Sequence, residues 1–385
     1  MTSHYGVRLA RALAGLVLTV FAVGATQAHE RKANAPPRGD QPMNVTVDVK
    51  PSLPHAGTSL ASSLCPLMQA AGRPEWSMAR LVGVMGHAFQ FEMKEGGGSV
   101  MHDHIDWGLA LDLLPEIVQF RTFNATARDE DIDLPALKRE ARDAVRAGLA
   151  RGYPAMAWSP MSPEMKAEPP PHPVCWGLLI GYNETEETYT VRHPWVSDTY
   201  TVRYDAIGPG GHNPWFNVKV FDKPSAIDEK TTHLRALRDA VAFADGTRYK
   251  GDDDHSAEHR AQPQGFAAYD LWREAFGSED IPLESSRHNA DMLKSRRLLA
   301  AEYVRELTVI FPEAAEPLAA AATHYDRELE SLNPLYDLCV AAKKNQAWSA
   351  GNRAEAGRLI GEALKADREA IASIEAALSL LNRSQ

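Results

Sequence analysis

The chain contains very little cysteine. Its 385 residues include three cysteines, Cys65, Cys175 and Cys339. So few cysteines exclude a disulfide scaffold, and their odd number leaves at least one thiol that does not pair within the chain. An exposed thiol is easily oxidised outside the cytoplasm, so we expect each cysteine either to be buried or to carry chemistry. Cys339 lies in a helical, apolar stretch and is expected in a core.

The chain also has no excess of basic side chains. It has 41 lysines and arginines against 51 aspartates and glutamates, a formal net charge of −10 at pH 7. Nucleic acids and anionic membranes bind basic faces, so neither is expected as a partner. The sequence has no glycine-rich phosphate-binding loop, no serine nucleophile elbow and no paired-cysteine zinc motif, so no cofactor is predicted.

Long apolar runs are confined to the N-terminus. Arg8 and Arg11 precede an apolar run over residues 12–25, and the small residues Ala25 and Ala28 offer cleavage sites. This order is typical of a signal peptide, predicted over residues 1–28, and predicts a secreted or periplasmic protein. The run is shorter than the roughly 20 residues that span a bilayer. No integral membrane segment is therefore expected in the mature chain, and an uncleaved anchor is the alternative.

The rest of the chain divides by composition into three parts. Residues 29–45 are polar and proline-bearing and are predicted to be disordered. Residues 46–224 mix helical stretches with short β-rich runs, which predicts an α+β domain with a central antiparallel sheet. Residues 225–385 are alanine-rich with helical periodicity, which predicts an all-α helical bundle.

Periodicity and composition predict the individual elements. The expected helices cover residues 58–71, 136–151, 231–244, 264–276, 314–344 and 353–381, and a further helix ends before Pro312. The expected strands cover residues 155–158, 174–182, 188–193, 199–204 and 216–221. Residues 177–182 are apolar on both faces and are predicted to form the central strand. Prolines forbid both helix and ladder over residues 159–173, which should form a surface loop.

Cys65 is the first candidate for a reactive residue. It directly precedes Pro66, and proline is favoured at the first position of a helix. A helix that starts at Pro66 would place Cys65 at its N-terminus, where the helix dipole stabilises a thiolate and free N–H groups could hold an oxyanion. The alternative is a single helix that begins at Thr58, with Cys65 a small buried core residue.

Three segments occur in an order that resembles a known family. They are Cys65 on an early helix, a glycine–phenylalanine segment at residues 86–91, and a strand that ends in Gly181 and Tyr182. This layout resembles the N-terminal domain of the butirosin biosynthesis protein H family, within the papain-like cysteine peptidases, over about residues 50–222. Residues 265–272 (GFAAYDLW) also look like the helical bundle that follows this domain in related bacterial proteins. The resemblance implies a papain-like fold and cysteine-based acyl transfer.

The chain departs from the family pattern at the active site. The position of the family's histidine base holds Cys175, and the position of its orienting carboxylate holds His193. No glutamine stands about six residues before Cys65. His193 could still accept the proton of Cys65, since adjacent strands lie about 5 Å apart. His172, in the proline-bearing loop, is a second candidate base, and a third possibility is that no active pair forms and His193 is structural.

Other roles are possible for these residues and for two further groups of residues. Cys65 and Cys175 could form a disulfide, which would remove nucleophilicity, or could join His193 as ligands for zinc or copper. Residues 101–104 (Met-His-Asp-His) could bind a metal if they are extended, although a polar loop tip is the simpler interpretation. Tryptophans around the predicted cleft could bind a ligand or fill a core; they are Trp107, Trp158, Trp176 and Trp195.

Two functions follow from these residues. The first is an exported papain-like cysteine acyltransferase or peptidase that acts on an amide or thioester, with Cys65 as nucleophile and His193 as base. The second is a catalytically silent binding protein that holds a small molecule or peptide in the same cleft.

Overall fold

The computed structural model describes residues 44–49, 58–98, 107–162, 165, 175–194, 196, 198–209, 213, 215–248 and 262–383. All of them belong to one compact unit, which runs from Met43 to Gln385. The predicted signal peptide and most of the predicted lead-in lie outside the described residues, as do most of the proline-bearing loop, His172 and residues 101–104. No helix in the described ranges is long and apolar enough to cross a membrane.

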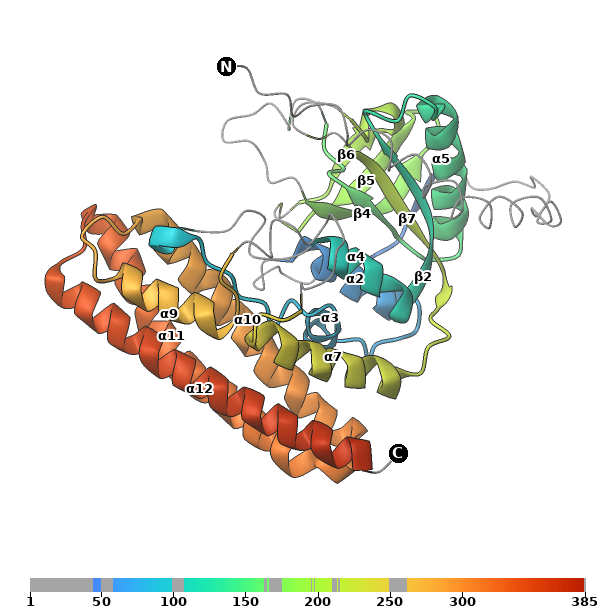
Figure 1. The fold of residues 1–385 in the computed structure, drawn as a ribbon. Helices are drawn as coiled ribbons and strands as arrows, with labels where there is room; N and C mark the ends of the chain where they lie inside the picture. The colour runs from blue at the N-terminus through green and yellow to red at the C-terminus, as the bar shows by residue number, and fades with distance from the viewer. Residues whose placement is uncertain are drawn as a thin grey trace, which may run out of the picture. The chain divides into compact units, whose positions relative to one another are not determined.

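The described strands form one antiparallel sheet (Figure 1). The strands are β1 (Asn44–Thr46), β2 (Val118–Thr126), β3 (Ala155–Trp158), β4 (Trp176–Asn183), β5 (Thr188–Arg192), β6 (Tyr200–Arg203) and β7 (Trp215–Pro224). Their order is β2-β7-β3-β4-β5-β6, with β1 paired to the far end of β4. The prediction of an α+β fold with an antiparallel sheet is confirmed.

The five expected strands are all present, and two strands were not expected. β1 begins at Asn44, inside the segment predicted to be disordered, because its backbone pairs with residues 181–183 of β4. β2 pairs with β7 along its whole length, although about 90 residues separate them in the chain. β4 pairs with three strands and lies inside the sheet, as its two-sided apolar pattern predicts.

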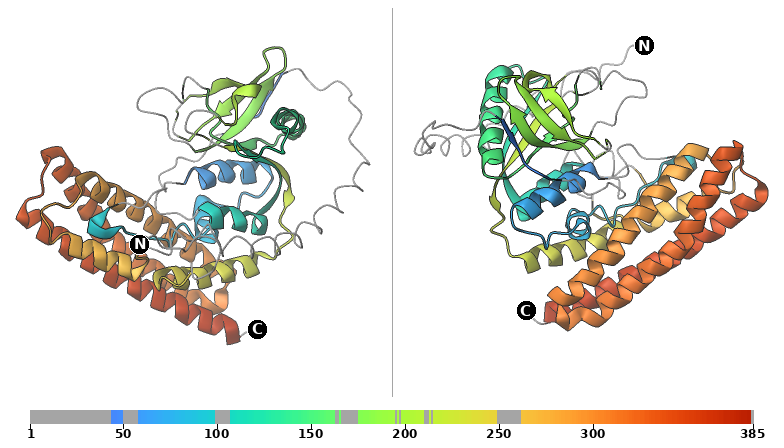
Figure 2. Two further views of the ribbon diagram at one scale, coloured as in Figure 1. Left: turned by 45° about the horizontal axis from the view of Figure 1, so that its top comes forward. Right: turned by 180° about the vertical axis from the view of Figure 1, so that it is seen from behind.

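Helices pack against both faces of the sheet (Figure 2). The helices of this region are α2 (Ser59–Ala70), α3 (Met78–Val84), α4 (Trp107–Leu113) and α5 (Leu134–Ala150). Leu64 of α2 belongs to the same core as Leu178 and Ile180 of β4. Val145 of α5 shares the opposite core with Leu179. Alternate side chains of β4 therefore serve two different cores.

The C-terminal region is helical, as predicted (Figure 1). Its described helices are α7 (Glu229–Ala244), α9 (Phe266–Ala275), α10 (Leu283–Ile310), α11 (Ala315–Asn345) and α12 (Ala350–Arg383). The three long helices α10, α11 and α12 lie side by side in both views of Figure 2. α10 ends directly before Phe311 and Pro312, where the proline ring prevents the helix from continuing.

A buried ionic cluster joins these helices to the segment after α3. The guanidinium of Arg297 on α10 lies 3.2 Å from Glu328 of α11 and 3.3 Å from Asp367 of α12. It also donates a hydrogen bond to the carbonyl of Ala88 at 2.6 Å, while the hydroxyl of Tyr269 on α9 donates to Glu328. Arg297 of α10 therefore contacts α9, α11, α12 and the loop after α3.

The cluster holds more acid than base. One guanidinium faces two carboxyl groups, and burial raises the pKa of both Glu328 and Asp367 above the usual range. Burial of two carboxylates beside one cation is costly, so the cluster favours retention of a proton on one of them. Removal of the cation should therefore cost much more stability than neutralisation of one acid.

We expect Arg297→Met to lower the free energy of unfolding by about 3–5 kcal/mol at neutral pH, because it leaves two acids buried without a cation. Glu328→Gln should cost much less, since the Arg297–Asp367 pair survives and the amide oxygen can still accept from Tyr269. Urea denaturation of both variants measures the difference. A loss below about 1 kcal/mol in Arg297→Met would contradict the proposed role of the cation.

The pH dependence gives a second check on the same pair. A carboxyl group whose folded pKa lies above its unfolded pKa of 4.5 destabilises the fold as the pH rises beyond that value. Glu328→Gln lacks this group, so its stability should improve relative to the wild type as the pH is raised from about 5 to about 8.

Candidate functional site

Cys175 and His193 lie together at one end of β4. Cys175 directly precedes β4, and His193 directly follows β5. The two strands are antiparallel neighbours with Leu178 opposite Arg192, which brings the start of β4 to the end of β5. The thiol sulfur of Cys175 lies 3.0 Å from Nε2 of His193. The side chains are 5% and 1% exposed, so the thiol and imidazole form a buried pair.

Glycine at position 177 makes room for this pair. A Cβ atom on Gly177 would lie 3.2 Å from Cδ2 of His193 and 2.9 Å from Cγ of Pro160. The imidazole therefore lies over Gly177. Side chains alternate along a strand, so this face is opposite to that of Leu178, which packs into the core shared with α2. The Cys175–His193 pair lies on the side of β4 that faces away from α2.

Cys65 lies in the core on the other side. α2 begins at Ser59 with Thr58 as its cap, so Pro66 lies inside the helix and Cys65 lies in its second turn. The prediction of a helix N-terminus at Pro66 is wrong, and the alternative of one helix from Thr58 is correct. Pro66 has no N–H, and the following N–H groups lie within the helix, so the oxyanion site proposed there is not supported.

The described contacts of Cys65 lie within its own part of the chain. Its sulfur lies 3.8 Å from the carbonyl of Trp76 and 3.7 Å from Nε2 of Gln69, and the residue is 3% exposed. The described contact of the His193 ring is with Cys175, and the pairing of His193 with Cys65 stays a prediction. None of the three cysteines forms a disulfide. In the described part of the chain, Cys65, Cys175 and His193 also do not gather as a metal-binding group.

Ser159 lies beside Cys175 in a strained backbone conformation. Its φ angle is +46°, and it is completely buried. Its N–H donates to the carbonyl of Cys175 at 2.8 Å, whereas its hydroxyl has no hydrogen-bond partner within the described ranges. Tyr200 lies next to this segment, and its hydroxyl donates to the carbonyl of Pro160 at 3.0 Å. The pKa of Tyr200 is raised mainly by burial and further by the nearby Cys175. Strained residues of this kind concentrate at functional sites.

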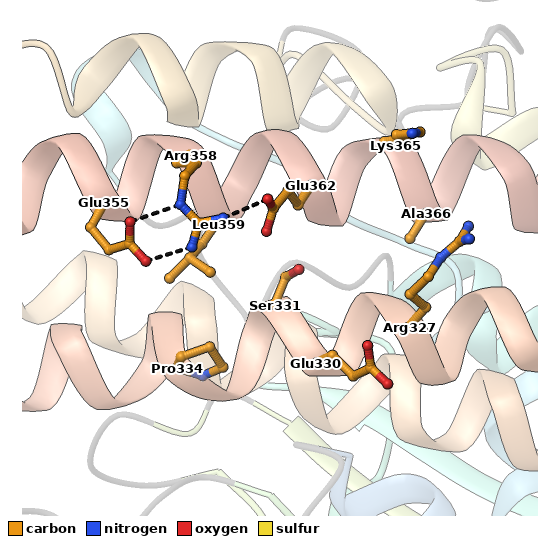
Figure 3. Close-up of a pocket in the computed structure, with 10 residues that line it drawn as sticks. All are labelled: Arg327, Glu330, Ser331, Pro334, Glu355, Arg358, Leu359, Glu362, Lys365 and Ala366. Carbon is orange, nitrogen blue, oxygen red and sulfur yellow. Dashed lines mark hydrogen bonds and ion pairs between the residues drawn. The ribbon is translucent and has the colours of Figure 1, made fainter.

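A hollow lies on the surface between α11 and α12 (Figure 3). Its volume is about 500 Å³. Figure 3 shows Arg358 held between Glu355 and Glu362, and Arg327 forms an ion pair with Glu369 nearby. Two of its arginines are thus paired with carboxylates of the fold. The Cys175–His193 pair is the better candidate site.

No family model matches the chain, and no curated protein matches it. The chemistry of the site therefore follows from its own geometry. A thiol beside an imidazole can pass its proton to the ring and become a nucleophile. The sequence named both residues, but it could not show that they face each other, because their contact depends on the register of β4 against β5.

We expect Ser159→Gly to raise the free energy of unfolding by about 1 kcal/mol. Glycine removes about 1–2 kcal/mol of left-handed backbone strain and the cost of a buried hydroxyl without a partner, and loses about 0.5–1 kcal/mol through the unfolded chain. Glu187→Gly is the matched control, because Glu187 also has a positive φ but lies exposed in a turn. Thermal and urea unfolding should show a larger gain for Ser159→Gly, and a loss of stability would contradict this account.

Proposed function

We propose that this protein is an exported cysteine enzyme of the acyl-transfer class, with Cys175 as nucleophile and His193 as general base, acting on an amide or a thioester. The observation that carries the proposal is the 3.0 Å contact between the Cys175 sulfur and Nε2 of His193. Four further residues lie next to this pair: Gly177, Pro160, Ser159 and Tyr200.

The reaction needs only these two side chains and water. The Cys175 sulfur attacks the substrate carbonyl carbon as its proton passes to Nε2 of His193. The imidazolium then donates that proton to the leaving amine or thiol, which leaves an acyl thioester on Cys175. Water attacks this thioester, with His193 now accepting a proton from the water, and the carboxylic acid and free thiol are released. The bond to Cys175 thus forms and breaks within one cycle.

The proposal includes a papain-like scaffold with altered positions in its active site. An antiparallel sheet, an early helix that packs on it and a C-terminal helical region agree with such a scaffold. In the family that the sequence resembles, the strand that corresponds to β4 carries a histidine base and the next strand carries a carboxylate. Here Cys175 and His193 take these positions, so the proposed nucleophile comes from the strand and not from the helix.

Export is part of the same proposal and rests on the signal-peptide pattern of residues 1–28. A thiol that works outside the cytoplasm must avoid oxidation. The 5% exposure of Cys175 and the absence of a disulfide in the structure are both consistent with a protected thiol.

Thiol alkylation tests the proposed nucleophile. With iodoacetamide near neutral pH, followed by peptide mapping, we expect Cys175 to react at least about tenfold faster than Cys65 or Cys339. Cys339 should be slow because burial raises the pKa of its thiol to about 12. His193→Gln should slow Cys175 by about 100-fold, the usual contribution of a general base. Unfolded protein, in which all three thiols should react alike, is the control.

A burst experiment tests catalysis separately from reactivity. p-Nitrophenyl acetate should release about one equivalent of p-nitrophenol per chain as the acyl-enzyme forms. Cys175→Ser should lose this burst, and Cys65→Ser should keep it. Loss of the burst in Cys65→Ser alone would return the role to Cys65. Equal alkylation of all three cysteines together with no burst would exclude the enzyme and favour a binding protein.

A further inference from the structure

The face of the sheet opposite to the Cys175–His193 pair carries a cluster of tryptophans around a lysine. We call this cluster the tryptophan–lysine face; it consists of Trp158, Trp176, Trp215 and Lys219. The ring centroids of Trp158 and Trp176 lie 5.5 Å apart, and those of Trp158 and Trp215 lie 6.3 Å apart, both edge to face. The ammonium of Lys219 lies 5.9 Å from the centre of the Trp176 ring. Trp176 belongs to the core shared with α2, so this face is separate from the Cys175–His193 pair.

Lys219 is buried without a carboxylate partner in the described part of the chain. It is 8% exposed, and its contacts are the Trp176 ring and the hydroxyl of Thr122 at 3.4 Å. Burial lowers its pKa to about 8. Lysine is rarely buried without an ion pair, because transfer of an ammonium out of water is costly. An anion beside Lys219 would offset this cost.

Asn217 adds a second incomplete polar group to the same face. It lies two residues before Lys219 on β7, so the two side chains point to the same side of the sheet. Its Oδ1 atom is buried and has no hydrogen-bond partner among the residues that the structure describes. The face is also open at one end, since exposure rises from 2% at Trp176 to 44% at Trp215. One face of the sheet thus carries a buried ammonium, a buried amide oxygen and three indole rings, and it reaches solvent at Trp215.

We propose that the tryptophan–lysine face binds a small organic acid whose carboxylate pairs with Lys219, whose N–H or O–H donates to Asn217, and whose apolar body packs on the tryptophans. A single ammonium balances the charge of one carboxylate. This binding site is independent of the proposed acyl transfer, because it lies on the other face of the sheet.

N-Benzoylglycine is a suitable probe, because it combines a carboxylate, an N–H and a phenyl ring. Its neutral amide, N-benzoylglycinamide, is the matched ligand. By calorimetric titration near pH 7 we expect the acid to bind at least about tenfold tighter than the amide, as for a charge-assisted hydrogen bond. The preference should fall as the pH is raised through about 8, when Lys219 loses its proton.

Variants assign the preference to this lysine. Lys219→Met should bring the affinity for the acid down to that for the amide, with the amide unaffected. Lys223→Met, at an exposed position on the same strand, should change neither affinity. Cys175→Ser should bind as the wild type does, so a failure of the acyl-transfer proposal would not affect this result.

Two outcomes would overturn the proposal. One is equal binding, or no binding, of the acid and the amide to the wild-type protein at pH 7. The other is a preference for the acid that persists in Lys219→Met or does not change with pH. The pH series uses wild-type protein only, so it decides the matter even if Lys219→Met does not fold.

Discussion

The alternation of side chains along β4 determines how this structure uses its residues. β4 lies inside the sheet and is covered on both faces, so each successive residue serves a different layer. Cys175 and Trp176 are consecutive, yet the thiol meets His193 on one side while the indole meets Lys219 on the other. One strand end therefore supplies both candidate sites, and a shift of one residue in its register would dismantle both.

Local patterns in the sequence predicted most of the elements, and non-local pairing explains those that were missed. The five expected strands are apolar or alternating runs bounded by turns. β2 was missed because it is an outer strand in which polar residues such as Arg121 and Asn124 are mixed with apolar ones. Its pairing partner, β7, is also distant in the chain. β1 is too short to show a pattern at all. Its order comes from pairing with β4.

The candidate site was predicted in its residues but not in their pairing. The Cys65–Pro66 step suggested a helix start, but Thr58 caps the helix earlier through the hydrogen bond from Ala61 N–H. Helix α2 continues through the proline despite the N–H it lacks. The geometry that replaces this expectation depends on the β4–β5 register and on Gly177, whose missing side chain leaves space for His193. Neither feature has a local signature that distinguishes a site from an ordinary hairpin.

Two buried cations show how structure and binding can be told apart. Arg297 has two carboxylates, a carbonyl and a tyrosine around it, so its charge is used within the fold. Lys219 is almost as deeply buried, but among the described residues its ammonium meets an indole ring and a hydroxyl and no carboxylate. Burial removes the hydration of both cations. Among the described residues, carboxylates offset this loss for Arg297 and not for Lys219. A fold that keeps the second cation carries a destabilising group, and perturbed ionisable groups of this kind cluster at functional sites.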